Sequence, residues 1–133
     1  MTAEEIMKAV ECGCRTFYFG GFGDFDELCH KIVTKIKNEN PEIEIKRIFC
    51  VPREQDLRKT GRYFKEGLYE DFIYLEPSFD GWYKSIYFRN CAMIDHSDII
   101  IFYAESRKNS GAYKTYKYAK RKKDKQVINL WDD

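Results

Sequence analysis

The sequence lacks a long apolar run, a basic leader and an excess of charge of either sign. No stretch approaches the roughly 20 consecutive apolar residues that cross a bilayer, and the chain opens with Thr2-Ala3-Glu4-Glu5 where a secretory signal would carry positive charge. Lys and Arg number 23 against 22 Asp and Glu, and the resulting net charge of +1 argues against a generally basic nucleic-acid binder. We therefore expect a cytoplasmic protein that has no membrane partner and for which nucleic acid is not the main partner.

Cysteine and histidine are too few and too irregularly spaced for a disulfide framework or a metal site. The five cysteines are an odd number without framework spacing, so we expect reduced thiols. Cys12-Gly13-Cys14 is too tight for the usual zinc pattern, and His30 and His96 have no second ligand at helical spacing. The sequence predicts no metal and no cofactor.

The residues that are present fit one domain over residues 1–133, because 44% of them are hydrophobic and can bury a core. β-Forming segments alternate with segments of helical periodicity. The predicted strands are 15–19, 43–51, 71–75, 99–103 and 127–130, and the predicted helices are 2–11, 24–39, 82–94 and 110–122. Residues 53–70 form a long polar excursion with room for one helical turn. The alternation predicts an α/β fold, Rossmann-like, with a single doubly wound, mainly parallel sheet of about five strands flanked by helices.

A glycine-rich loop, Gly20-Gly21-Phe22-Gly23, connects the first predicted strand to its helix. Glycines there let a ligand approach the backbone closely. The acids that follow, Asp24 and Asp26, would repel a phosphate, so we expect them to cap the helix or to accept hydrogen bonds from sugar hydroxyls.

A second loop leads from the fourth predicted strand into the last helix and carries Ser110, Gly111, Ala112 and Lys114. The helix begins with small residues and no acid in its first turn, and an anion can bind backbone N–H groups at such a start. An ordinary capped helix start fits these residues equally well. Because ligands bind outside the carboxyl ends of parallel strands, we expect this loop and the glycine loop to meet at one site.

Asn90 lies on the apolar side of its predicted helix, between Ile86 and Met93. A buried amide needs hydrogen-bond partners. Either a neighbouring loop provides them, or Asn90 contacts the ligand with Arg89 beside it.

The last predicted helix carries a run of lysines interleaved with Tyr113, Tyr116 and Tyr118. A solvated face with positive charge near a helix C-terminus explains most of this run. The interleaved aromatic residues leave nucleic acid as a weaker alternative partner.

Three segments of the sequence resemble the SLOG group of bacterial proteins. They are residues 17–23, residues 89–98 (Arg-Asn-Cys-Ala-Met-Ile-Asp-His-Ser-Asp) and residues 110–115 (Ser-Gly-Ala-Tyr-Lys-Thr). The SLOG group is itself similar to the LOG phosphoribohydrolases, formerly called lysine decarboxylase-like, and to the nucleoside deoxyribosyltransferases. The resemblance covers nearly the whole chain and implies a Rossmann-like domain that binds nucleotides or their derivatives.

The chain departs from the enzymes of this grouping at the catalytic acid. LOG enzymes carry P-G-G-x-G-T-x-x-E, and here Tyr118 stands where the catalytic Glu belongs. In the deoxyribosyltransferase register, Thr115 takes the nucleophile's place, and a threonine without an adjacent base is a poor nucleophile. The resemblance therefore favours a non-enzymatic binder of a nucleotide or an ADP-ribose-like ligand, acting as a sensor through loop closure or self-association.

An enzyme is the alternative: an N-glycosidic hydrolase or transferase with a relocated acid, for which Glu105, Asp24 and Asp26 are the candidates. A structural or protein-interaction role is a third possibility. It would be indicated if no nucleotide changed the stability of the protein. The predicted ligand-binding residues are Gly20, Gly21, Phe22, Gly23, Asp24, Arg89, Asn90, Ser110, Gly111, Ala112 and Lys114.

Overall fold

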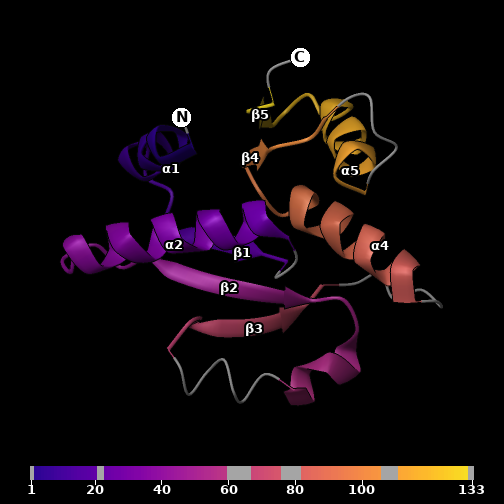
Figure 1. Cartoon of the computed structure of the whole chain (residues 1–133), viewed down its shortest axis with the longest axis horizontal. Helices are drawn as coiled ribbons and strands as arrows, with labels where there is room; N and C mark the ends of the chain where they lie inside the picture. Colours follow the sequence, from indigo (N-terminus) through magenta and orange to yellow (C-terminus); the bar gives the residue numbers. More distant parts are fainter. Residues whose placement is uncertain (1, 21–22, 60–66, 76–81, 106–110, 132–133) are drawn as a thin grey trace. The chain divides into compact units, whose positions relative to one another are not determined.

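A computed structural model describes residues 2–20, 23–59, 67–75, 82–105 and 111–131, without the side chains of residues 59 and 82–85. The chain divides into two compact units, Met1–Leu75 and Glu76–Asp133. Each unit combines helices with parallel strands (Figure 1), which confirms the α/β class. The single-domain assignment of residues 1–133 stays a prediction.

The first unit contains a parallel sheet of three strands in the order β1-β2-β3. These are β1 (Thr16–Phe19), β2 (Lys46–Val51) and β3 (Asp71–Tyr74). The register pairs Tyr18 with Ile48 and Cys50 with Ile73. Because the strands are parallel, their carboxyl ends lie at one edge of the sheet, which places the start of the glycine loop at that edge.

The described residues of this unit form three helical segments beside the sheet. They are α1 (Thr2–Glu11), α2 (Asp24–Glu39) and the 3₁₀ helix η1 (Glu54–Lys59). Helix α1 ends in a Schellman motif, in which the Cys14 N–H donates to the Ala9 carbonyl and the Gly13 N–H to that of Val10, with Gly13 at φ +106°. Helix α2 runs along one face of the sheet in Figure 1. The excursion at residues 53–70, expected to have room for one helical turn, contains the six-residue 3₁₀ helix η1.

The core of the first unit is built from Ile45 just before β2, from the end of β2 and from one side of each long helix. Ile45, Cys50, Val51 and Val33 are almost completely shielded from solvent. Ile6, Ala9 and Val10 of α1 are also buried, as the helical spacing of apolar residues predicts.

The second unit contains α4 (Trp82–Asp95), β4 (Ile99–Phe102), α5 (Gly111–Lys120) and β5 (Gln126–Asn129). Strands β4 and β5 are parallel, with Ile100 opposite Val127, and α5 lies between them in sequence. A cluster of Ile94, Phe102 and two alanines forms the core, with three tyrosines of α5 packed around it. No helix among the described residues is long and apolar enough to cross a membrane.

The structure corrects the expected single sheet of about five strands. All five predicted strands exist, but the described residues pair them in two sheets, one of three strands and one of two. In β4, Ile99, Ile100 and Ile101 are partly buried and Phe102 is buried. Apolar runs and alternating helices determine that strands are parallel, but they carry no information about which strand neighbours which.

Candidate functional site

The predicted ligand-binding residues fall into both units, so each group is described within its own unit. The glycine loop belongs to the first unit, and Arg89, Asn90 and the start of α5 belong to the second. Gly21, Phe22 and Ser110 lie outside the described residues.

The described ends of the glycine loop are held by the protein's own groups. The Gly20 N–H donates to the Asp26 carboxylate, Oδ1, at 3.2 Å. Gly23 precedes α2 with φ +90° and ψ 162°, a backbone conformation that other residues rarely adopt. No side-chain hydrogen bond caps α2. Gly23 and Asp26 therefore have structural roles, and of the two predicted acids Asp24 is the exposed one.

The start of α5 differs from the start of α2. Gly111 opens the helix, and its φ is outside the left-handed region. Beyond its chain neighbours and the backbone of α5, no atom of the described residues lies within 4 Å of a side chain added there. Neither packing nor backbone conformation therefore requires glycine at this position. Ala112 and Lys114 are exposed, and the first turn carries no acid. The Thr115 hydroxyl donates to the Gly111 carbonyl at 2.8 Å, so that hydroxyl is committed within the helix.

On α4 the burial of Arg89 and Asn90 is the reverse of the sequence prediction. Arg89 is buried, with only 3% of its surface exposed, whereas Asn90 is partly buried. The Arg89 Nε donates to the Asn90 Oδ1 at 3.1 Å. The two candidates therefore act as a pair in which the amide oxygen of Asn90 accepts a hydrogen bond from a buried guanidinium.

Tyr118, at the position that the resemblance gives to a catalytic Glu, is bound to another side chain. Its hydroxyl donates to the Asp95 carboxylate, with distances of 2.9 and 3.0 Å to the two oxygens. Burial and this carboxylate raise the pKa of Tyr118. Lys122 lies 3.4 Å from the same carboxylate. Asp95 thus connects the end of α4 to α5.

The carboxyl ends of β4 and β5 carry residues that the sequence prediction missed. Tyr103 is 51% exposed, and its ring packs edge-to-face against Trp131, with ring centroids 5.1 Å apart. Asn129 joins the two chain segments: its amide accepts from the Ala104 N–H and donates to the Ala104 carbonyl, each at 3.0 Å. Glu105, the foremost candidate for a relocated acid, follows Ala104 and is partly buried.

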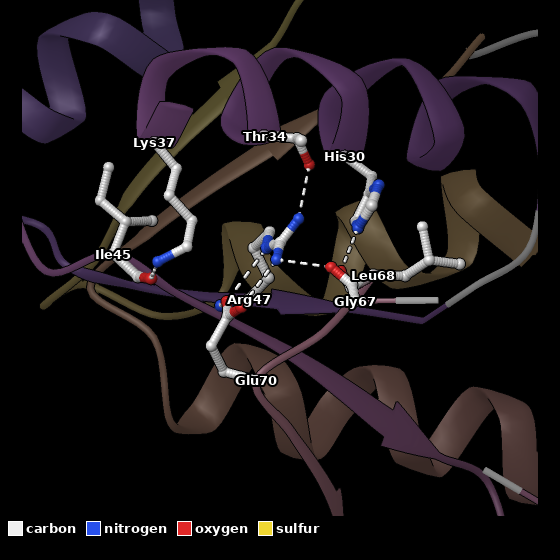
Figure 2. Close-up of polar contacts among 8 residues, drawn as sticks. All are labelled: His30, Thr34, Lys37, Ile45, Arg47, Gly67, Leu68 and Glu70. Carbon is white, nitrogen blue, oxygen red and sulfur yellow. Dashed lines mark hydrogen bonds and ion pairs between the residues drawn. The ribbon is translucent and has the colours of Figure 1, made fainter. Parts of the chain in front are cut away.

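A buried polar network in the first unit was also missed (Figure 2). Arg47 on β2 donates to both carboxylate oxygens of Glu70, to the Thr34 hydroxyl at 3.0 Å and to the Gly67 carbonyl at 2.9 Å. From the same side of α2 as Thr34, His30 Nε2 lies 2.6 Å from the Leu68 carbonyl. The network fixes residues 67–70, the end of the polar excursion, to β2 and α2.

The sequence contains one sign of this network. Arg47 is two residues from Ile45 and four from Val51, so it occupies an inward-facing position in the alternation of β2. A charged residue at such a position requires a partner of opposite charge. The sequence does not show that Glu70, 23 residues later, is that partner.

Comparison with protein-family models and with curated proteins finds no match to this chain. No described part of the chain gathers three or more His, Cys, Asp or Glu side chains in an arrangement that could hold a metal ion. No disulfide joins the five cysteines.

Proposed function

We propose that the protein binds a nucleotide or a nucleotide-derived, ADP-ribose-like ligand at the carboxyl ends of its parallel strands, with the phosphate at the start of α5. The observation that carries this proposal is Gly111. It opens the helix that follows β4 in sequence, no described residue crowds a side chain added there, and its backbone conformation does not require glycine. A ligand that needs close access to the backbone N–H groups accounts for a glycine at this position.

Charge at this helix start supports an anionic ligand. The first turn of α5 contains no acid, Lys114 is exposed, and the helix dipole adds partial positive charge. The start of α2 has Asp24, Asp26 and Glu27 in its first turn, which disfavours phosphate there. We therefore assign the phosphate to the start of α5 rather than to the start of α2.

We also propose that the chain is related to the SLOG group, that residues 1–133 form a single domain and that the protein is cytoplasmic. Binding is favoured over N-glycosidic cleavage because Tyr118 replaces the catalytic Glu and its hydroxyl is engaged by Asp95. The proposed role is that of a sensor, in which the occupied site changes a loop or the association of the protein.

The test is a panel of AMP, ADP, ATP, cyclic nucleotides and ADP-ribose, followed by calorimetry and thermal unfolding with the wild type and two variants. A ligand at 100 times its dissociation constant raises the free energy of unfolding by about 2.7 kcal/mol. Gly111→Asp places a carboxylate where the phosphate binds, so we expect it to abolish this increase. Without ligand, the same change stabilises α5 by about 0.3–1 kcal/mol through the helix dipole, so lost binding cannot be attributed to unfolding.

Leu28→Ala is the matched control, because Leu28 is exposed and lies in the other unit. We expect it to bind like the wild type. A panel without any binding ligand, or Gly111→Asp binding as tightly as the wild type, contradicts the proposal. Release of free base from AMP at an enzyme-like rate would replace it with the enzymatic alternative.

A further inference from the structure

We propose that Tyr103, supported by Trp131, is the platform on which the planar base of the bound nucleotide stacks. This inference rests on the proposed function and adds the part of the site that recognises the base. It is carried by an aromatic pair at the carboxyl edge of the β4–β5 sheet, independent of the helix start that receives the phosphate.

The exposure of Tyr103 is unusual for its surroundings. Phe102, the preceding residue, is buried in the core of the second unit, whereas Tyr103 is 51% exposed. Among the described residues the other large hydrophobic side chains with comparable exposure are Met7 and Leu28, both on helices of the first unit. An exposed ring directly after a parallel strand lies where α/β folds bind ligands.

The geometry of the pair leaves aromatic surface for a ligand. The rings of Tyr103 and Trp131 are inclined at 81° with centroids 5.1 Å apart, an edge-to-face contact. Such a contact brings the edge of one ring to one face of the other, so each ring keeps a face outside it. Trp131 packs against the tyrosine ring, and half of the Tyr103 surface still meets solvent.

The backbone under the pair is fixed by Asn129. Its amide makes two hydrogen bonds to Ala104, which is next to Tyr103, and its Oδ1 also accepts from the Trp131 N–H at 3.2 Å. Ala104 is 1% exposed, so these bonds are shielded from water. One side chain thus sets the position of both aromatic residues, and a rigid platform loses less entropy when a ligand binds.

A nucleobase is the occupant that fits this surface. A planar heterocycle stacks on an aromatic ring without needing a particular hydrogen-bond pattern. The platform follows β4, the strand that precedes α5 in the second unit. Glu105, two residues beyond the platform, adds a carboxylate that can accept a hydrogen bond from an exocyclic amine.

The test separates the base from the rest of the ligand. AMP and ribose 5-phosphate differ only by the base, so we would measure the affinity of both, and of ADP-ribose, by calorimetry. We expect Tyr103→Ala to lower the affinity for AMP and for ADP-ribose by about 5- to 150-fold, the range for loss of one base–aromatic stack. Binding of ribose 5-phosphate should not change, and Tyr103→Phe should bind all three ligands within about twofold of the wild type, because the ring remains.

Tyr103→Leu is the second variant, because leucine keeps apolar contact with Trp131 but has no ring. It should show the same selective loss as Tyr103→Ala with less effect on thermal unfolding. The stacking role of Tyr103 is wrong if both variants bind AMP like the wild type, or if their affinities for AMP and ribose 5-phosphate fall equally. Either result leaves the proposed nucleotide site in place. If the wild type binds no nucleotide, the proposed function is wrong and the platform with it.

Discussion

Arg47 and Glu70 form a bidentate ion pair, in which the Arg47 Nε lies 3.0 Å from the Glu70 Oε1 and the Arg47 Nη2 lies 2.6 Å from the Glu70 Oε2. The Arg47 N–H also donates to Oε1 at 2.7 Å. The arginine side chain is 7% exposed and that of the glutamate 31%. Water can reach the Glu70 carboxylate but hardly reaches the Arg47 guanidinium. The buried charge of Arg47 therefore needs its ion-pair partner more than the charge of Glu70 does.

This asymmetry predicts unequal effects of removing either partner. Glu70→Ala leaves a buried guanidinium without its counter-charge and should lower the free energy of unfolding by about 3–5 kcal/mol. Arg47→Met leaves a carboxylate that water can reach and should cost less, about 1–3 kcal/mol. Urea denaturation measures both. The control is Glu27→Ala, which breaks an exposed pair with Lys31 and should change stability by less than about 0.5 kcal/mol. Equal losses for Glu70→Ala and Arg47→Met would contradict the asymmetry.

The same pair predicts a dependence of stability on pH. Burial alone raises the pKa of Glu70, but the hydrogen bonds and the charge of Arg47 lower it below its ordinary 4.5. A carboxyl whose pKa is lowered by folding stabilises the protein above its unfolded pKa, and this contribution is lost as the pH falls through the folded pKa. The difference in unfolding free energy between wild type and Glu70→Gln should therefore shrink from pH 7 to pH 3. A difference that stays constant over this range would show that the charge of Glu70 does not matter.

Cys29 should be an unreactive thiol. Burial, and secondarily the charge of Asp26, raise its pKa to about 12. At pH 8.5 only a small fraction is thiolate, so iodoacetamide should label Cys29 at least about 100-fold more slowly in the folded protein than in guanidinium chloride. Peptide mass spectrometry gives both rates, and Cys12, which is exposed, serves as the internal control. Labelling of Cys29 at the rate of Cys12 would contradict the prediction.

How far the sequence predicts this molecule depends on whether a feature is local. The order and type of helices and strands follow from periodicity and turn residues, and the structure confirms them from α1 to β5. Strand order is not local, and the predicted single sheet is wrong for the described residues. The predicted strand start at residue 43 was also too early, since β2 begins at Lys46.

The candidate site shows the same division. Gly111 and Lys114 were recognisable because a helix start is a local pattern. Tyr103 and Trp131 were not, since 28 residues separate them and β4–β5 pairing brings them together. Helical spacing placed Asn90 rather than Arg89 on the buried side of α4, because a pattern of apolar residues cannot indicate that a guanidinium is buried beside an amide.

Asn90 offers a test of that pair. Asn90→Leu removes the oxygen that accepts from the buried Arg89 Nε and should cost about 1–3 kcal/mol. Asn90→Asp keeps an acceptor at this position and should cost less. If Asn90 also contacts the ligand, the affinity for AMP falls in Asn90→Leu. Unchanged affinity with lower stability would limit Asn90 to supporting Arg89.

Asn129 should stabilise the carboxyl ends of β4 and β5. The substitutions Asn129→Leu and Asn129→Asp separate the contribution of its amide N–H from that of its amide oxygen. Asn129→Leu leaves the Ala104 N–H and carbonyl without their partner, and at 1% exposure Ala104 has little access to water as a replacement. The expected cost is about 1–3 kcal/mol for each buried group left unsatisfied. Asn129→Asp keeps the acceptor for the Ala104 N–H but places a carboxylate oxygen against the Ala104 carbonyl, so it should also be destabilised, more strongly at pH 7 than at pH 4.

Urea denaturation at both pH values measures these changes. Asn38→Leu, at an exposed position of α2, is the matched control and should change stability by less than about 0.5 kcal/mol. Asn129 positions Tyr103 and Trp131 together. Asn129→Leu should therefore lower the affinity for AMP more than the affinity for ribose 5-phosphate, as the Tyr103→Ala and Tyr103→Leu variants do. An Asn129→Leu protein as stable as the wild type would show that the two strand ends are held by β4–β5 pairing alone, and that the aromatic pair does not depend on this amide.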